Sequence, residues 1–340
     1  MKRLKELFVT RGFILYILFF IGLSIVPVFT SSRYILNMLI YFGMYLLLSM
    51  GLNLMIGGVG LLALCTPLFF GVGAYTSAIL TTFHNFPFLG GLLLGMVFSA
   101  VVAYVVGILA LRVSYHAFAI ITLAFMIIFQ LVAYDWVSLT KGPMGIPGIP
   151  RPSISIPSIG TWTFDTPTEL YYLITVLVII SVVVFYRIQN SRLGRTFISI
   201  REDEPLAEAY GVDSKKYKII AFVIGGIFGG IAGSYYAHYV KFVSPEIFSM
   251  YLLTTLLIIV IVGGAGYLEG VIIGAFLFTV IPEALRLAPE IRDLIYALLL
   301  IVILIKAPEG VYGRYKEKMR RLVLQKKTKE KKGDLHEVSA

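Results

Sequence analysis

The run FLGGLLLGMVFSAVVAYVVGILAL, residues 88–111, contains no charged residue and decides the fold class. A helix of this length, at about 1.5 Å per residue, crosses the ~30 Å hydrocarbon core of a bilayer. Similar apolar runs recur along the 340 residues, of which 58% are hydrophobic and 14% charged, whereas soluble domains carry about 25% charged residues. The sequence therefore predicts an all-α, polytopic integral membrane protein.

We predict about ten transmembrane helices, including short or broken ones. Their expected bounds are 13–29, 34–56, 64–82, 88–111, 115–134, 169–186, 218–240, 250–267, 269–286 and 292–306. The first is read as an uncleaved span, because Met1–Thr30 lacks the usual cleavage pattern of a signal peptide. One transmembrane domain is expected over residues 1–313, followed by a basic tail, 314–340, that is disordered at its end.

The distribution of Lys and Arg predicts the orientation. Of the 29 basic residues, 23 fall in the first eleven residues, at Arg112, between Arg187 and Lys218, and from Lys306 onward. Basic residues resist translocation. Both termini and the internal charged segment are therefore expected in the cytoplasm, which requires an even number of spans. The net charge of +10 lies in loops and in the tail, where it suits anionic lipid, and we expect no nucleic-acid partner.

Two absences bear on what kind of membrane protein the chain is. No Asp or Glu occurs between Glu6 and Asp135, although at least four predicted spans lie there, and ion-coupled carriers usually place carboxylates at membrane depth. A phosphate-binding Gly-x-x-x-x-Gly-Lys-Ser/Thr loop is also missing, because Gly-Lys never occurs. The chain is thus not expected to be an enzyme, and ATP, if it is the energy source, is hydrolysed by another chain. A passive channel remains an alternative.

The charged segment between Arg187 and Lys218 predicts a short cytoplasmic helix from about Glu204 to Tyr210. Asp203 suits its N-cap, Pro205 its first turn and Gly211 its left-handed stop. Two helical turns are not stable alone in water, so the helix is expected to rest in a groove of a partner. The alternative is an amphipathic loop lying on the bilayer surface.

The same segment, with seven others in order, resembles the permeases of branched-chain amino acid ABC importers of the LivM type. The similar motifs are Ser191-Arg-Leu-Gly194-Arg195 through Ala221-Phe222, Gly51-Leu-Asn53-Leu, Phe69-Phe70-Gly71-x-Gly73-Ala74-Tyr75, Phe118-Ala119-Ile-x-Thr122-Leu123-Ala124-Phe125, Leu139-Thr140-x-Gly142-Pro143-x-Gly145, Ser244-Pro245-Glu246, Gly263-Gly264-x-Gly266 and Pro308-Glu-Gly310. They span residues 35–313. An ordered set of this size is specific, although each motif alone is weak.

The resemblance implies a permease subunit that forms half of the translocation path for branched-chain or other hydrophobic amino acids. Its implied partners are a second, homologous permease, two ATP-binding cassette subunits that carry ATP and Mg²⁺, and an extracytoplasmic solute-binding protein, in a prokaryotic cytoplasmic (inner) membrane. The chain itself is expected to hold no cofactor. Loop 187–217 would couple to the ATPase through Arg195, Arg201, Glu204, Leu206, Glu208, Ala209, Tyr210 and Gly211.

The segment from Gly57 to Tyr75 is the candidate for the substrate pathway. Clustered glycines and Pro67 must interrupt the helix at membrane depth, which is tolerated where backbone is buried or lines a wet cavity. The candidate pathway residues are Asn53, Thr66, Phe69, Phe70, Tyr75, Thr122 and Gln130. Leu61, Ala63, Cys65 and Thr66 make this site less polar than is common in the family, so urea or short amides stay open as substrates. A kinked structural helix is the alternative for the segment.

Three further expectations complete the sequence-based picture. Small residues at four-residue spacing predict close helix packing at Gly225, Gly229 and Gly233, and the glycine-rich motif Gly263, Gly264 and Gly266, which lies in an apolar span, predicts the same. Loop 135–168 is expected to be external and to face the solute-binding protein, or to be a plain connector. No metal site is expected, because the four His residues and the single Cys65 show no ligand spacing.

Overall fold

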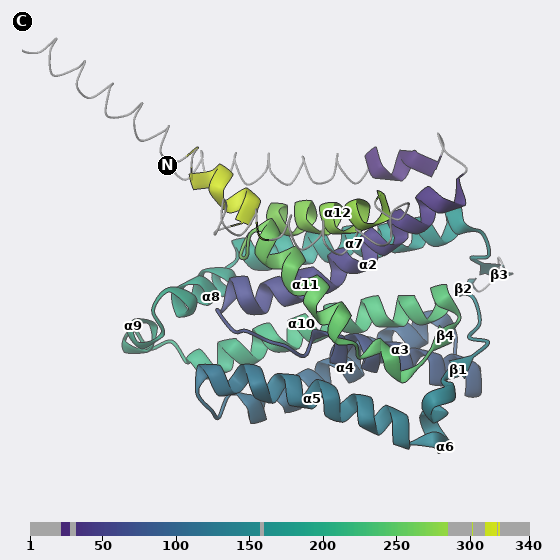
Figure 1. Ribbon diagram of the computed structural model, residues 1–340, viewed down its shortest axis with the longest axis horizontal. Helices are drawn as coiled ribbons and strands as arrows, with labels where there is room; N and C mark the ends of the chain where they lie inside the picture. Colours follow the sequence, from purple (N-terminus) through teal and green to yellow (C-terminus); the bar gives the residue numbers. More distant parts are fainter. Residues whose placement is uncertain are drawn as a thin grey trace, which may run out of the picture. The chain divides into compact units, whose positions relative to one another are not determined.

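The computed structural model describes residues 22–27, 32–156, 160–284 and 310–317, together with residues 301 and 319. The chain divides into two compact units, Met1–Leu257 and Ile258–Ala340, and each is described separately. The first unit holds most of the labelled helices in Figure 1. Whether residues 1–313 act as one domain stays a prediction.

The first unit is a bundle of long helices. Their bounds are α2 Arg33–Asn53, α3 Thr66–Phe83, α4 Phe88–Ala110, α5 Tyr115–Asp135, α7 Pro167–Asn190 and α10 Ser214–Val240. Local signals set several of these ends. At the start of α7, for example, Glu169 N donates to Thr166 Oγ1 at 3.3 Å and Thr166 N donates to Glu169 Oε2 at 2.9 Å, which forms a capping box.

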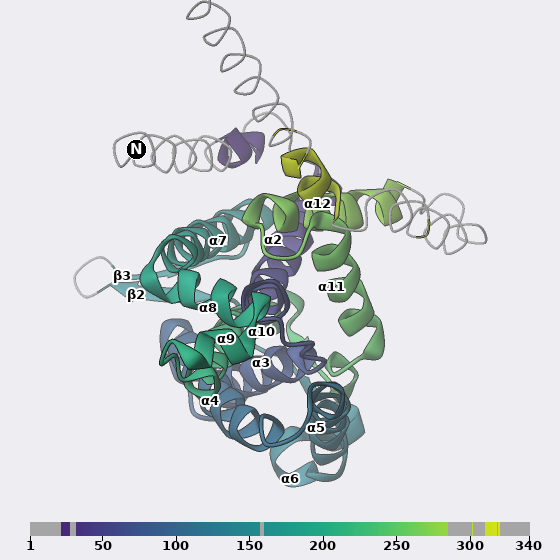
Figure 2. The ribbon, with the colours of Figure 1, turned by 90° about the vertical axis from the view of Figure 1, so that its left-hand side faces the viewer.

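Helix α10 is the central element of this unit. It packs against α3, α4 and α2, and α2 also packs against α7; Figure 2 shows α10 between these helices. Two rows of glycine on α10 make the packing close. Because apolar side chains gain little by leaving lipid, such close backbone contact is a main source of helix association in membranes.

A segment of short elements joins α5 to α7 and covers one end of the bundle. It contains α6 Val137–Thr140, the 3₁₀ turn η2 Gly142–Met144, β1 Ile146–Pro147, β2 Ser153–Ile156 and β3 Gly160–Thr163. Strands β2 and β3 form an antiparallel hairpin, while β1 pairs with β4, Phe242–Val243, just after α10. The pairing fixes this segment to the end of α10.

A buried histidine strengthens the same attachment. Pro150 O, which can only accept, lies 2.8 Å from Nδ1 of His238. In the neutral ring Nδ1 therefore carries the proton, and Nε2 accepts the hydroxyl proton of Ser77 across 2.9 Å. The described part of the 135–168 loop is thus bonded to His238 of α10, which is bonded in turn to Ser77 of α3.

Helix α11, Met250–Gly263, follows the 3₁₀ turn η3, Pro245–Ile247, and leads from the first unit into the second. The second unit adds α12, Leu268–Ala284, and helical residues 310–317. A tight turn joins α11 to α12, with positive φ at Gly264 and Gly266. A Cβ atom added at Gly263 would meet the Gly270 carbonyl oxygen at 2.1 Å, so the glycine-rich motif lies in a helix–helix contact.

The helices agree with the predicted fold class at a coarse level. Among the described residues, six helical segments are long and apolar enough to cross a membrane: Arg33–Gly58, Phe88–Ala110, Tyr115–Asp135, Pro167–Asn190, Ser214–Val240 and Pro245–Gly263. Eight predicted spans coincide with α2, α3, α4, α5, α7, α10, α11 and α12. The predicted spans 13–29 and 292–306, and the tail from 320 onward, lie outside the described residues apart from 22–27 and 301. The total of ten and the orientation of the termini stay predictions.

Candidate translocation and coupling sites

The interruption predicted after Gly57 is present as a π-helical turn followed by non-helical backbone. Helix α2 continues into the π-turn η1, Leu54–Gly58, and regular structure resumes at α3. Gly60 has a φ of +76°, and Leu61 N donates back to Met55 O at 2.8 Å. This irregular backbone is buried within the protein, with Leu61, Ala63 and Cys65 at most 3% exposed.

Thr122 holds this irregular segment in place. Its Oγ1 accepts a hydrogen bond from Leu64 N at 3.1 Å and donates to Ala119 O at 2.9 Å. A buried backbone N–H without a partner would be costly, so this hydroxyl has a structural task on α5. The neighbouring Thr66 is fully buried at the first residue of α3, and its hydroxyl has no hydrogen-bond partner among the described residues.

The other predicted pathway residues occupy different surroundings. Asn53 and Phe69 are buried at 1% and 0% exposure, and the Phe69 ring packs edge-on against Phe222. Tyr75 stacks on Phe248 with ring centroids 6.1 Å apart. Gln130 is half-buried on α5. Phe70 alone of the seven candidates lines the large cavity described below.

The two glycine rows of α10 touch different neighbours. In the first row, an added Cβ at Gly233 would lie 1.9 Å from Phe70 O, and one at Gly225 would lie 2.8 Å from Met55 Cε. In the parallel row, an added Cβ at Gly226 would lie 2.6 Å from Ala103 Cβ. One row therefore packs on α2 and α3 and the other on α4.

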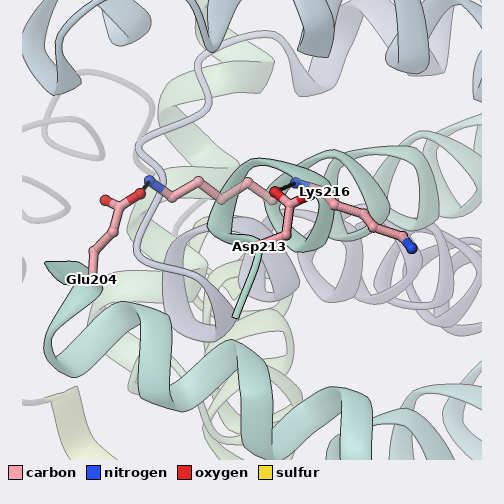
Figure 3. A network of polar contacts seen from close by, with 4 residues as sticks. Glu204, Asp213 and Lys216 are labelled. Atoms are coloured by element: carbon pink, nitrogen blue, oxygen red, sulfur yellow. Dashed lines mark hydrogen bonds and ion pairs between the residues drawn. The ribbon is translucent and has the colours of Figure 1, made fainter. Parts of the chain in front are cut away.

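The predicted short helix after Asp203 is present as α9, Glu204–Ala209. Asp203 Oδ1 accepts from Leu206 N at 3.0 Å, and Gly211 has a φ of +83°. Figure 3 shows Glu204 extended toward the first turn of α10, where Lys218 Nζ donates to its carboxylate at 2.5 Å. Asp213, also in Figure 3, caps α10 by accepting from Lys216 N at 3.1 Å. The N-terminal end of α9 is thus fixed by its cap and by the ion pair, although the helix is short.

The outer side of α9 is open and apolar. Leu206 is 54% exposed and Tyr210, just after the helix, is 82% exposed, while Ala207 is buried. Ala209 and Glu208 are also exposed. The exposed Leu206 and Tyr210 make this side of α9 a candidate interaction surface.

Two arginines of the preceding helix, α8 Arg192–Glu202, have different environments. The Arg201 guanidinium donates to Gly57 O of η1, and the Arg201 stem lies against Gly60. Arg195 instead donates only weakly, at 3.4 Å, to the nearby Asn190 O. Arg201, predicted as a residue that meets the ATPase, is therefore directed toward the interrupted helix.

A cavity of about 340 Å³ lies in the first unit between α2, α10 and the segment that runs from β4 into α11. Four tyrosines line it: Tyr41, Tyr45, Tyr236 and Tyr251. The ring centroids of Tyr41 and Tyr45 lie 6.4 Å apart, and Glu246 also lines the cavity. Sequence reasoning did not select these residues, although the four-residue spacing of Tyr41 and Tyr45 and the Ser-Pro-Glu motif were visible signals.

A bundle of long apolar helices with an interrupted helix, beside a basic segment that presents an exposed short helix, is the arrangement expected of a transport permease. The family model described as "Branched-chain amino acid transport system / permease component" matches residues 34–304. The chain belongs to this family.

Curated relatives agree with this assignment. The chain is 31% identical to the high-affinity branched-chain amino acid transport system permease protein LivM of Escherichia coli K12, with 86% of this chain and 74% of the relative covered. Identity to the LivH permease protein of the same system and strain is 26%, over 79% and 91% of the two chains. A probable LivM of Methanocaldococcus jannaschii is 23% identical over 72% and 79%. No solved structure matches the chain significantly.

Proposed function

We propose that the chain carries branched-chain or similar apolar amino acids across a prokaryotic inner membrane as one permease of an ATP-driven importer. Both LivM and LivH relatives match most of this chain, which supports pairing with a second permease of the same family. Two ATPase subunits and a solute-binding protein complete the proposed assembly. Both termini and α9 would then be cytoplasmic, in line with the distribution of basic residues.

The observation that carries the proposal is the exposed apolar side of α9. A helix of six residues does not persist alone, yet α9 is held by the Asp203 cap and the Glu204–Lys218 ion pair. Leu206 and Tyr210 are left without cover by the described residues. A rigid support that presents two apolar side chains suits a groove on another protein, and an ATPase subunit would supply that groove.

A passive channel is not favoured, because the family and its relatives are permease components of transport systems. The two functions still make opposite predictions in proteoliposomes. An importer permease takes up leucine only when ATPase partners, ATP and binding protein are present. A channel formed by this chain alone would pass urea or leucine without ATP, and that result would overturn the proposal.

The docking role of α9 is tested by retention of the ATPase subunits during purification in detergent. We expect Tyr210→Ala and Leu206→Ala together to reduce the retained ATPase at least tenfold, since large apolar anchors usually carry most of an interface's free energy. Met144→Ala is the matched control, because Met144 is also 82% exposed but lies in η2 at the opposite end of the bundle. Equal retention by the variant and the control would refute docking through α9.

A further inference from the structure

The cavity between α2, α10 and the β4–α11 segment has the composition of a binding site for a small charged solute. Its volume of about 340 Å³ falls within the range of ligand pockets, about 300–1,000 Å³. At about 30 Å³ per water molecule in the liquid, the space equals roughly ten waters, which suits an amino acid of leucine size. All lining residues belong to the first unit.

The charged and aromatic groups of the lining favour a cation. Glu246 is the single charged residue among those that line the cavity in the described part of the chain. Among the described residues, the ion pair joins Lys218 to Glu204, which lie away from the cavity. The Glu246 carboxylate is therefore available to a solute. Tyrosine rings attract an ammonium group through their faces, and four of them surround the same space.

The lining also contains groups for the rest of an amino acid. Ser249 Oγ accepts from Leu252 N at 3.2 Å, so its own proton remains for an acceptor such as a carboxylate. The phenol hydroxyls are further donors. Met44 and Leu48 on α2 and Phe70 on α3 supply apolar contacts, and the thioether side chain of methionine adapts to varied aliphatic shapes.

We propose that this cavity binds the transported solute as a free α-amino acid, with the ammonium group between Glu246 and the tyrosines and the aliphatic side chain against Met44, Leu48 and Phe70. The inference rests on the proposed function, since it assigns a substrate site to that permease. It also selects among substrates: urea and short amides carry no positive charge and gain little from Glu246. Leucine, isoleucine and valine carry both an ammonium group for the charged part of the lining and an aliphatic side chain for its apolar part.

Protection of a cysteine against alkylthiolation tests the site directly. The chain has a single cysteine, Cys65, which is fully buried, so a Cys65→Ala background leaves this chain without a thiol, and labelling is followed on this chain after it is separated from its partners. Ser249→Cys places a thiol in the cavity lining, and Ser138→Cys places one on exposed α6 as the matched control. The variants are assembled with the second permease and the ATPase subunits in lipid nanodiscs, without binding protein, and treated with a small, charged methanethiosulfonate.

We expect millimolar leucine to slow the reaction of the Ser249→Cys variant at least fivefold and to leave Ser138→Cys unchanged. Isoamylamine, which keeps the ammonium group, protects partially, whereas 4-methylpentanoate and urea do not protect. Adding Glu246→Gln removes the protection by leucine, and Glu246→Asp retains part of it. A residue that only docks the binding protein would not affect this assay.

Three results would overturn the proposal. The first is no reaction of the Ser249→Cys variant in the assembled complex, which would show that lipid or the second permease fills the cavity. The second is a reaction rate that leucine leaves unchanged, and the third is protection by leucine that survives Glu246→Gln. Failure of the proposed function is seen separately, as leucine uptake by the unmodified complex without ATP.

Discussion

The contact between Arg201 and Gly57 O predicts a specific loss of coupling. Arg201 lies in the last turn of α8, three residues before the start of α9 at Glu204, and its guanidinium donates to a carbonyl of the π-turn that follows α2. Arg201→Ala removes this charged hydrogen bond, and such bonds contribute about 1.5–3 kcal/mol. Because the Arg201 side chain is exposed overall, water compensates in part and the lower figure applies.

A loss of about 1.5 kcal/mol corresponds to roughly a tenfold change in an equilibrium between two conformations. We therefore expect the amount of leucine transported per ATP hydrolysed to fall about tenfold in proteoliposomes that contain the complete importer. ATPase retention should stay normal, because the exposed side of α9 is unchanged. Arg201→Lys keeps one charged donor and should restore part of the ratio.

Arg195→Ala is the matched control for this experiment. It removes an arginine from the same helix, but one whose hydrogen bond to Asn190 O is long and exposed. The reasoning is refuted if the two alanine variants transport the same amount of leucine per ATP. It is also refuted if Arg201→Ala releases the ATPase subunits, since Arg201 would then be a docking residue.

Two further variants test the packing that supports both sites, and a third tests the ion pair on α9. Gly233→Ala places a methyl group 1.9 Å from Phe70 O. The overpacking should lower the free energy of unfolding by about 1–3 kcal/mol or more, which is measured as a lower melting temperature in detergent. Gly58→Ala is the control, because the nearest atom to its added methyl group is 3.9 Å away, and it should melt as the unmodified protein does. His238→Ala leaves Pro150 O and the Ser77 hydroxyl without their partner. The fold should lose about 1–3 kcal/mol of stability, and residues 141–156 should be cut faster by a protease. His84→Ala, at an exposed histidine, is the control, and equal proteolysis of the two variants would contradict the structural role of His238. Glu204→Gln breaks the ion pair with Lys218, in which the Glu204 side chain is 41% exposed. Such exposed pairs contribute about 1 kcal/mol or less, so the amount of leucine transported per ATP should fall by less than about fivefold. A loss as large as that of Arg201→Ala would show that this ion pair also couples α9 to transport.

Local signals explain why α9 could be predicted closely from the sequence. Its N-cap, its proline in the first turn and its left-handed stop each act within three or four residues. The break after α2 was predictable for a similar reason, because Gly57, Gly58 and Gly60 lower the stability of a helix and Pro67 suits the first turn of the helix that follows. The π-turn itself was not predicted; it lies where Gly57 and Gly58 meet α8, a contact between distant parts of the sequence.

The candidate pathway was harder to predict because polarity and position do not reveal a side chain's partner. Thr122 was a reasonable candidate for contact with a solute, yet its hydroxyl is engaged by Leu64 N and Ala119 O. The Phe69 ring packs edge-on against Phe222 and so has a structural contact of its own. The cavity combines Tyr45 of α2 with Tyr236 of α10 and Glu246 of η3, and only tertiary structure brings such distant parts of the sequence together.

Helix α2 connects the coupling segment, α8 and α9, to the tyrosine-lined cavity. Arg201 contacts η1 at the end of this helix, and Tyr45, about 12 residues earlier, lines the cavity, so the two points are roughly 18 Å apart at 1.5 Å per residue. Helix α2 is packed too closely to bend freely between them, since an added Cβ at Gly51 would lie 2.8 Å from Gly225 O and one at Gly43 the same distance from Ile174 Cγ1. A displacement of α8 would therefore move α2 as a rigid element, with the irregular backbone from η1 to Cys65 absorbing the change in geometry. Under the proposed function, this is how events at α9 reach the wall of the cavity without a charged relay in the membrane.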